Sequence, residues 1–216
     1  MVIKQNSLNH KGGFYFFRIH TKKLDKLCNG FSNLNNFLNE VLHNCPNEYF
    51  NSGPRSSMLK LKLDFDLKKV EGHEVCDLAN QGLIENSARY NNNHLRVQSF
   101  MLENDNNTIA TEVPIWLKYD EADYYMDLFK TTQPLTGHID LLRLENDKIW
   151  IWDYKPNSNN EEFASTQIYF YALMLSKRTN IDLSNFRCGY FDKNYAYMFK
   201  PDSNILKKNK YIKEFL

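Results

Sequence analysis

The sequence predicts an α/β domain in which helices flank a central mixed β-sheet. Three apolar runs between residues 108 and 155 have the length and composition of strands. A helical pattern follows over residues 161–177, and two aromatic-rich runs come after it, at 186–191 and 195–199. Strands that alternate with helices in this order are typical of α/β sheets.

The composition is that of a folded globular chain. Of the 216 residues, 42% are hydrophobic and 14% are aromatic, which is enough for a packed core and excludes a disordered tail protein. The formal net charge is only +1, so any basic surface for nucleic acid must be local. No apolar run has the length of a membrane span or the pattern of a signal peptide. We therefore expect a cytoplasmic protein with no membrane partner.

The spacing of the cysteines also favours a cytoplasmic location. They are widely separated and form no CxxC pair: Cys28, Cys45, Cys76 and Cys188. We expect reduced, mostly buried thiols rather than a disulfide framework or a zinc site.

Residues 1–82 are expected to form an N-terminal extension or subdomain. A helix is predicted at 34–42, and a loop at 51–54. Residues 59–69, LKLKLDFDLKK, alternate strictly between apolar and polar side chains, which predicts a half-exposed strand. Two helices are expected next, around residues 74–81 and 84–103.

Residues 83–201 are expected to form the core. Its strands are predicted at 108–118, 135–144 and 148–155. The polar residues 157–160 offer N-caps for the helix over 161–177. A hairpin joins 186–191 to 195–199, and the lysine-rich residues 202–216 are expected to be a C-terminal tail.

The register of one predicted hairpin brings two aspartates together. A tight turn at Asn146–Asp147 is a hairpin signal between apolar runs. The pairs that follow from it are Glu145–Lys148, Leu144–Ile149 and Leu142–Ile151. Asp140 then falls opposite Asp153. Because side chains alternate between the two faces of a strand, Lys155 shares a face with Asp153, and His138 with Asp140.

Two opposed carboxylates require a positive partner. Their Cβ atoms would lie roughly 5 Å apart, where like charges are destabilising. A divalent cation removes this conflict, and hard oxygen ligands suit Mg²⁺ or Mn²⁺. An ion held by Asp140 and Asp153 can polarise a phosphodiester oxygen and activate a water, while Lys155 stabilises charge on the phosphate. The residues thus indicate phosphodiester hydrolysis.

A D-x-K pattern alone is a weak signal, and the chain contains a second one. Asp66 and Lys68 stand on the polar face of the predicted amphipathic strand, without a glycine-led aspartate upstream, so we interpret them as a solvated edge. Around residues 153–155 the aromatic flanks predict a buried strand, where unpaired charge is costly. The alternative for Asp153 and Lys155 is a structural salt bridge.

Three motifs stand in order: G-x-x-D at 137–140, D-x-K at 153–155 and Q-x-x-x-Y at 167–171. Together they resemble the RecB-like branch of the PD-(D/E)XK nuclease superfamily, which is related to lambda exonuclease-type enzymes and to CRISPR-associated nucleases with an iron–sulfur cluster. The resemblance covers about residues 83–201 and implies a restriction-endonuclease-like core. The cluster-bearing relatives need several cysteines near the end of the core, where this chain has only Cys188, so we expect no iron–sulfur cluster.

The resemblance also implies roles for individual residues. Asp140 and Asp153 resemble the metal carboxylates and Lys155 the catalytic lysine, and the carbonyl of Tyr154 is expected to complete the metal shell. On the helix that follows, Gln167 and Tyr171 would support the active site and contact substrate; the alternative is that they simply pack against the sheet.

Glu112 fits the glutamate that the family places on the first core strand, where it could orient other groups rather than bind metal. For the family's upstream histidine ligand there are two candidates, His94 and His73, and we prefer His94. A lone helix histidine is more often structural. His138 would face the site beside Lys155 and could touch substrate.

The resemblance implies a metal-dependent DNA nuclease, either an exonuclease or an enzyme that processes ends or single strands in repair or recombination, and the motifs leave an endonuclease open. The chain has no Walker motif, so any helicase or repair complex would be a separate partner. Two alternatives remain: a non-catalytic nucleic-acid-binding module, and a structural partner that docks through its N-terminal third.

Overall fold

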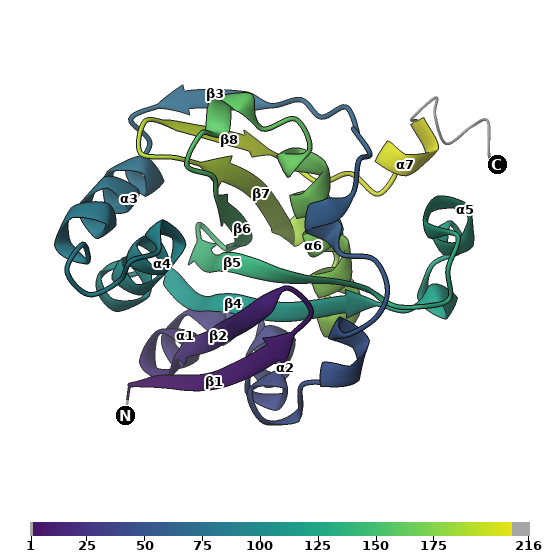
Figure 1. Cartoon of the computed structure of the whole chain (residues 1–216), viewed down its shortest axis with the longest axis horizontal. Coiled ribbons are helices and arrows are strands. Elements are labelled where there is room, and N and C mark those ends of the chain that lie inside the picture. Colours follow the sequence, from purple (N-terminus) through teal and green to yellow (C-terminus); the bar gives the residue numbers. More distant parts are fainter. Residues whose placement is uncertain (1, 209–216) are drawn as a thin grey trace.

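An eight-stranded mixed sheet runs through the molecule, and helices pack against both of its faces (Figure 1). The computed structural model describes residues 2–208. The strands are β1 Ile3–His10, β2 Gly13–His20, β3 Lys68–Glu71, β4 Thr108–Leu117, β5 Leu135–Glu145, β6 Lys148–Tyr154, β7 Phe186–Phe191 and β8 Tyr195–Phe199. Across the sheet their order is β1-β2-β4-β5-β6-β7-β8-β3. Neighbouring strands are antiparallel except β6 and β7, so the predicted mixed α/β sheet is confirmed.

All the helices except α7, which follows β8, occupy connections between strands. The α-helices are α1 Thr21–Leu27, α2 Ser32–Asn44, α3 Glu74–Glu85, α4 Asn93–Asn104, α5 Tyr125–Phe129, α6 Ala164–Thr179 and α7 Ile205–Lys208. Short 3-10 helices lie at Cys28–Gly30, Asn47–Phe50, Ser56–Met58, Tyr119–Glu121, Ser158–Asn160 and Leu183–Asn185. Helix α6 is the crossover that parallel strands need, here between β6 and β7. Over residues 2–208, no helix combines the length and the apolar character that crossing a membrane requires.

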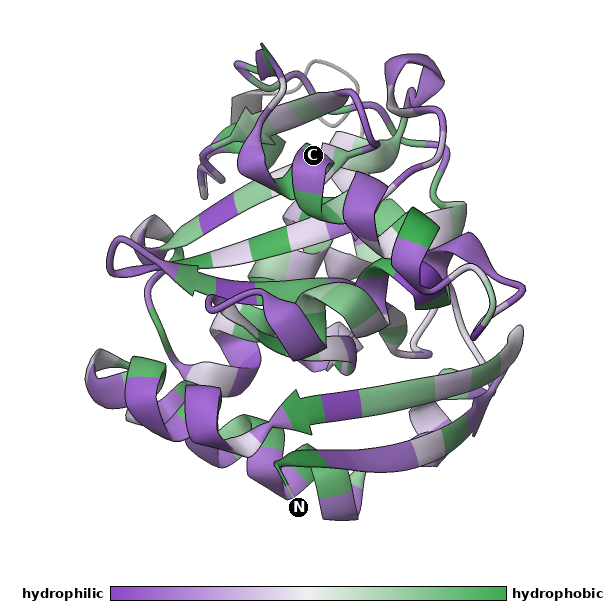
Figure 2. Cartoon of the chain, turned by 90° about the vertical axis from the view of Figure 1, so that its left-hand side faces the viewer, coloured by the Kyte–Doolittle hydropathy of each residue, from purple (hydrophilic) through white to green (hydrophobic). Residues whose placement is uncertain are grey.

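Two hydrophobic clusters form the core, one on each face of the sheet. In β6, Ile149 and Ile151 join the cluster that includes α1, α2 and α6, whereas Trp152 joins the cluster of α3 and α4. Because side chains of a strand alternate between faces, the two groups of helices cover opposite faces. Hydrophobic residues concentrate on the central strands and hydrophilic ones on the outer helices and loops (Figure 2).

The hairpin between β5 and β6 has the predicted register. Asn146 and Asp147 have φ values of 50° and 54°, the left-handed conformation that a two-residue hairpin turn requires. The observed pairs include Glu145–Lys148, Leu144–Ile149 and Leu142–Ile151. The prediction is therefore confirmed, and so are the strands at 108–118, 186–191 and 195–199 and the helix around 34–42.

The strand predicted at residues 59–69 is wrong for most of its length. The alternating burial is present, with Leu63 buried, but only Lys68–Glu71 pair with another strand, β8. The main-chain N–H of Leu63 instead donates to the hydroxyl of Thr166 on α6, at 2.9 Å. The segment has the periodicity of a strand but runs across a helix, where no neighbouring strand can complete a ladder.

Two helix predictions need correction at their N-terminal ends. A continuous helix at 84–103 is wrong, because α3 extends to Glu85 and α4 begins at Asn93, capped by the Asn92 side chain. Helix α6 begins at Ala164 and has no side-chain N-cap. The residues expected to cap it lie in a 3-10 turn, where the Ser158 hydroxyl and N–H donate to Asp192 near the start of β8. Of the predicted tail at 202–216, α7 is described and residues 209–216 lie outside the described residues.

The N-terminal region contributes more of the sheet than its sequence indicated. Strands β1 and β2 form a hairpin with Lys11 and Gly12 at its turn. Strand β2 continues the sheet by pairing with β4, and β3 pairs with β8 at the opposite edge. Six of the eight residues of β1 are not buried, so the apolar alternation that predicts a strand is missing there.

Candidate active site

One cavity gathers the predicted site residues except Tyr154 and the alternative ligand His73. Its volume is about 320 Å³. The predicted residues in its wall are His94, Glu112, His138, Asp140, Asp153, Lys155, Gln167 and Tyr171. They come from α4, β4, β5, the end of β6 and α6, so elements from both faces of the sheet contribute.

Strands β5 and β6 bring the two aspartates together. The ladder between them ends at the pair Leu141–Trp152, so Asp140 and Asp153 are the next positions in register. The strands separate at this point, and the main-chain N–H of Tyr154 donates to Asp140 Oδ2 at 3.0 Å. Both aspartates are buried, with exposures of 9% and 1%. The carboxylates therefore meet in a place where few water molecules can screen their charges.

Lys155 and two residues of α6 form a hydrogen-bonded network around Asp153. The Lys155 ammonium lies 2.7 Å from Asp153 Oδ2 and donates to Gln167 Oε1 at 3.2 Å. The Gln167 amide lies 3.1 Å from Asp153 Oδ1 and 2.7 Å from the Tyr171 hydroxyl. The salt bridge considered as an alternative is thus present. The Lys155 side chain also remains 18% exposed in the cavity wall, so the ion pair does not remove it from the cavity.

Glu112 occupies a strained position in β4. Residues 111 and 113 pair with 141 and 139 of β5, which places Glu112 opposite Asp140. Its φ is 51°, a left-handed conformation that is uncommon for a residue with a side chain. Its carboxyl group accepts a hydrogen bond from Gln98 on α4, at 2.8 Å. Such strain persists only where the surrounding structure maintains it, and it is concentrated at functional sites.

The charges of the cavity act on one another. Burial raises the pKa of Glu112, and the charge of Asp140 adds to this, giving about 8 although Gln98 opposes the shift. Burial also raises the pKa of Asp153, to about 6; Lys155 opposes this shift and Asp140 adds to it. For Lys155 burial lowers the pKa, but Asp153 and Asp140 outweigh it, so the pKa rises above its usual value. Burial and the neighbouring carboxylate thus both favour the protonated form of Glu112 and Asp153.

This charge distribution fits a divalent cation. Asp140 and Asp153 offer the hard oxygen atoms that Mg²⁺ and Mn²⁺ prefer, and a cation would offset the burial and the Asp140 charge that raise the pKa of Asp153. Within residues 2–208, no three His, Cys, Asp or Glu side chains are grouped closely enough to hold an ion by themselves. An ion at the two aspartates would need main-chain or water ligands as well, and the Tyr154 carbonyl remains our prediction for one of them.

The two candidate histidine ligands occupy different places. His94, on α4, lies in the cavity wall with its Nδ1 3.3 Å from Asp140 Oδ2. Burial lowers the pKa of His94, but the hydrogen bond and charge of Asp140 outweigh it and raise the pKa to about 8. His73 is the N-cap of α3 and accepts a hydrogen bond from the Val75 N–H. The structure therefore brings His94, rather than His73, to the aspartates.

His138 is held by the N-terminal hairpin. Its Nε2 lies 2.8 Å from His10 Nδ1, and its ring stacks on Tyr15 with centroids 3.8 Å apart. Burial, and then the charges of His10 and Arg55, lower its pKa well below the usual value, so His138 is neutral. His138 thus connects β5, two residues before Asp140, to β1 and β2.

Part of the cavity wall comes from residues that the sequence did not indicate. They are Gly12, Gly13, Phe14, Tyr15, Phe16, Arg55, Ser57, Asn92 and Leu95. Gln98, which binds Glu112, was also missed; its spacing of four residues from His94 on one helix was a usable signal. The residues of the β1–β2 hairpin gave no such signal, because only the pairing of β2 with β4 brings them to the cavity.

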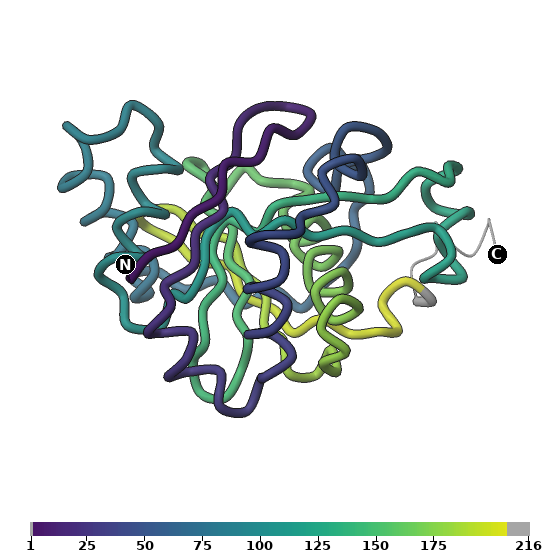
Figure 3. Tube along the Cα trace, turned by 90° about the horizontal axis from the view of Figure 1, so that it is seen from below, coloured from purple at the N-terminus to yellow at the C-terminus, as the bar shows by residue number. Residues whose placement is uncertain are grey.

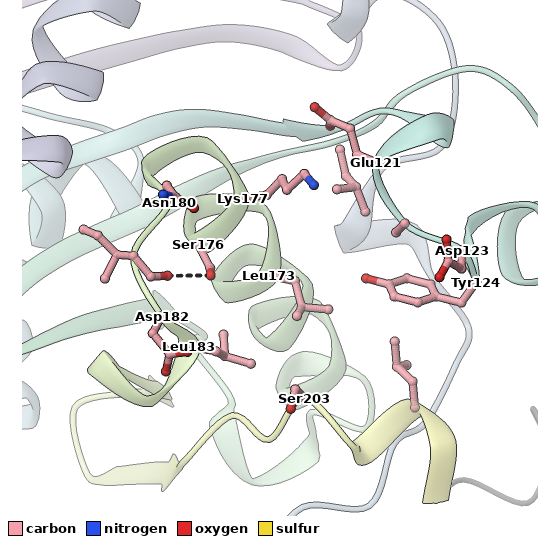
Figure 4. A pocket seen from close by; sticks show the side chains of 14 residues that line it. Glu121, Asp123, Tyr124, Leu173, Ser176, Lys177, Asn180, Asp182, Leu183 and Ser203 are labelled. Atoms are coloured by element: carbon pink, nitrogen blue, oxygen red, sulfur yellow. Dashed lines mark hydrogen bonds between the residues drawn. The ribbon is translucent and has the colours of Figure 1, made fainter.

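A larger cavity, of about 890 Å³, lies elsewhere (Figure 4). Leu173, Ser176 and Lys177 of α6 form one wall, and Asp123 and Tyr124 lie across from them. None of the residues predicted for catalysis or metal binding lines it. Its size therefore does not identify it as the active site.

Comparison with known proteins agrees with this geometry. The family model of the PD-(D/E)XK nuclease superfamily matches residues 40–214, which is more than half of the chain and includes all three motifs. A search of curated proteins finds no match. Nucleases of this superfamily typically use divalent metal ions. Membership of the RecB-like branch stays a prediction. With its three motifs assembled in one cavity, this chain belongs to the PD-(D/E)XK nuclease superfamily.

Proposed function

We propose that the protein is a metal-dependent DNA nuclease that hydrolyses phosphodiester bonds at ends or in single strands during repair or recombination. One observation carries the proposal. The Lys155 ammonium lies 2.7 Å from Asp153 Oδ2, in the wall of a cavity that also contains Asp140 and Glu112. A lysine beside paired carboxylates is an arrangement suited to phosphodiester hydrolysis. Family membership supports nucleic acid as the substrate class.

In this proposal Asp140 and Asp153 hold Mg²⁺ or Mn²⁺. When bound, such an ion polarises a phosphodiester oxygen and lowers the pKa of a water. Asp140 is prepared for this role by the Tyr154 N–H, which holds one of its oxygens at 3.0 Å. His94 stands beside the same oxygen, at 3.3 Å, either as a further ligand or as a donor that orients the carboxylate.

Lys155 supplies a fixed positive charge. Its raised pKa keeps the ammonium protonated at neutral pH, so it can stabilise negative charge that develops on the phosphate. Gln167 contacts both Lys155 and Asp153 and is itself hydrogen-bonded to Tyr171. We assign Gln167 and Tyr171 to positioning, and Glu112 to orienting groups around Asp140.

Label release from single- and double-stranded DNA and RNA tests the proposal. The full chain is incubated with Mg²⁺, Mn²⁺ or EDTA. We expect metal-dependent cleavage of DNA by the wild type and its complete loss in EDTA. In Asp153→Ala the rate should fall by at least about 100-fold, because one metal carboxylate is absent.

Asp66→Ala is the matched control. Asp66 begins the second D-x-K of the chain but is exposed and lies outside the cavity, so its removal should leave cleavage unchanged. Cleavage that survives in Asp153→Ala would contradict the site assignment. Tight DNA binding without cleavage under every metal condition would instead favour the non-catalytic binding module.

A further inference from the structure

The turn of the β1–β2 hairpin contributes to the wall of the candidate active site. Figure 3 shows this turn, in purple, standing clear of the central strands. Gly12 of the turn and Gly13 and Phe14 of β2 line the same cavity as Asp153 and Lys155. The family model begins at residue 40. The hairpin is therefore a contribution of this chain outside the part that matches the superfamily.

The hairpin is fixed in place rather than loosely attached. The Lys11 N–H donates to the Phe50 carbonyl at 3.1 Å. The guanidinium of Arg55 donates to the Lys11 carbonyl and to the Tyr15 hydroxyl, both at 2.5 Å. Because the Tyr15 ring also stacks on His138, the turn has a defined position relative to β5 and its aspartate.

The Phe14 side chain, at the start of β2, is unusually exposed for an aromatic residue in a strand. It keeps 72% of its accessible surface, whereas Phe17 on the same strand is fully buried. Phe16 is half-buried and lines the cavity two residues further along. Side chains two residues apart lie on the same face of a strand, so Phe14 and Phe16 form one aromatic edge that leads into the cavity.

The surroundings of this aromatic edge are basic. Lys11 is exposed at the turn, and Arg55 lines the cavity next to it. Aromatic faces beside positive charges are how proteins bind single-stranded nucleic acid without reading its sequence, since every base can stack and every nucleotide carries a phosphate. A base inside an intact duplex is already stacked and paired, and cannot use such a face.

We propose that Phe14 is a stacking platform for an unpaired base of the substrate strand, with Lys11 and Arg55 beside the neighbouring phosphates. The inference rests on the proposed nuclease function and refines it. The strand would enter the cavity past the hairpin, and substrates with an unpaired nucleotide next to the scissile phosphate would be preferred to blunt duplexes.

The test compares Phe14→Ala, Phe14→Trp and the wild type on a labelled single-stranded oligonucleotide and on a blunt duplex of the same sequence. Binding is measured in EDTA, and cleavage with Mn²⁺. We expect Phe14→Ala to weaken single-strand binding and to lower kcat/KM by about tenfold, the size typical of one lost base stack. Phe14→Trp should retain wild-type single-strand binding and kcat/KM. Cleavage of the blunt duplex should change less than about twofold in either variant.

Ile84→Ala is the matched control, since Ile84 is 65% exposed on α3 and does not line the cavity. It should behave as the wild type in every assay. Fluorescence gives an independent measure of stacking. A 2-aminopurine placed in the oligonucleotide next to the scissile phosphate should change its fluorescence on binding to the wild type but not on binding to Phe14→Ala. Thermal unfolding of each variant checks that the hairpin remains folded.

The outcomes separate the two proposals. Equal losses on single strand and duplex, or unchanged single-strand binding in Phe14→Ala, would overturn the stacking platform even if the wild type cleaves DNA. Binding in EDTA that depends on Phe14, with no cleavage under any metal condition, would support the platform while the nuclease proposal fails.

Discussion

The ring of Tyr171 lies against the main chain of Gly137 so closely that a Cβ at position 137 would be 2.3 Å from Tyr171 Cε1. This contact joins the glycine of G-x-x-D on β5 to the tyrosine of Q-x-x-x-Y on α6. Tyr171 in turn is hydrogen-bonded to Gln167, which contacts Lys155. The glycine is thus required by close packing at the candidate active site.

Gly137→Ala should therefore lower activity through the position of Tyr171. The added methyl group displaces the ring and with it Gln167, and we expect kcat to fall by about tenfold or more and stability by about 1–3 kcal/mol. Cleavage rates and urea unfolding measure the two effects. Gly30→Ala is the control, because nothing lies within 4 Å of a Cβ there. A Gly137→Ala variant with wild-type kcat would disprove the link.

Removal of the Lys155 charge should affect both the reaction and Asp153. In Lys155→Met, burial and the Asp140 charge still raise the pKa of Asp153, but the Lys155 charge that opposes them is absent. The pKa of Asp153 should therefore rise above its wild-type value of about 6. We expect kcat to fall by at least about 100-fold. Carboxyl-carbon NMR titration without metal measures the pKa. Lys148→Met, at the other end of β6, should leave both quantities unchanged.

The backbone strain at Glu112 predicts a variant that loses activity but is more stable than a variant that keeps the strain. Glu112→Gly removes the steric cost of the φ of 51°, whereas Glu112→Gln keeps it. We expect the glycine variant to be more stable than the glutamine variant by about 1 kcal/mol, yet to lose activity because the carboxyl group is gone. Urea unfolding and label release measure the pair. A glycine variant less stable than the glutamine variant would show that the main chain is unstrained.

A buried ion pair away from the cavity predicts how stability depends on pH. Arg143 is fully buried and its Nε lies 2.8 Å from Asp105 Oδ2. Burial alone would raise the pKa of Asp105, but the charge and hydrogen bonds of Arg143 outweigh it and lower the pKa below 3.8. The stabilisation is therefore present above pH 3.8 and is lost as the pH falls through the lower folded-state value.

Asp105→Asn tests this pair. It removes the buried carboxylate partner of Arg143 and leaves Glu74 and Glu145, at 2.9 and 3.4 Å, as the remaining partners of the buried guanidinium, so we expect a loss of about 1–3 kcal/mol at pH 7. The variant should also lose less stability than the wild type between pH 5 and pH 3, because the titrating carboxylate is absent. Urea unfolding at several pH values measures both. The exposed Asp64→Asn is the control and should follow the wild-type profile.

Local patterns were sufficient for the centre of the fold. The Asn146–Asp147 turn and the two-residue repeat of β5 and β6 depend only on neighbouring residues, so the register that brings Asp140 next to Asp153 was predictable. The four-residue spacing on α6 likewise placed Gln167 and Tyr171 on one face.

Contacts between distant segments decided the rest. Whether an alternating segment becomes a strand depends on a partner, and residues 59–67 meet α6 instead of a strand. The β1–β2 hairpin reaches the cavity only because Arg18 pairs with Thr111, far along the chain. The choice of His94 over His73 also depends on how α4 packs. The sequence by itself determined the β5–β6 hairpin and the shared face of Gln167 and Tyr171, because both depend on local spacing. Only the tertiary structure brought the β1–β2 hairpin to the cavity wall, because long-range pairing leaves no local pattern.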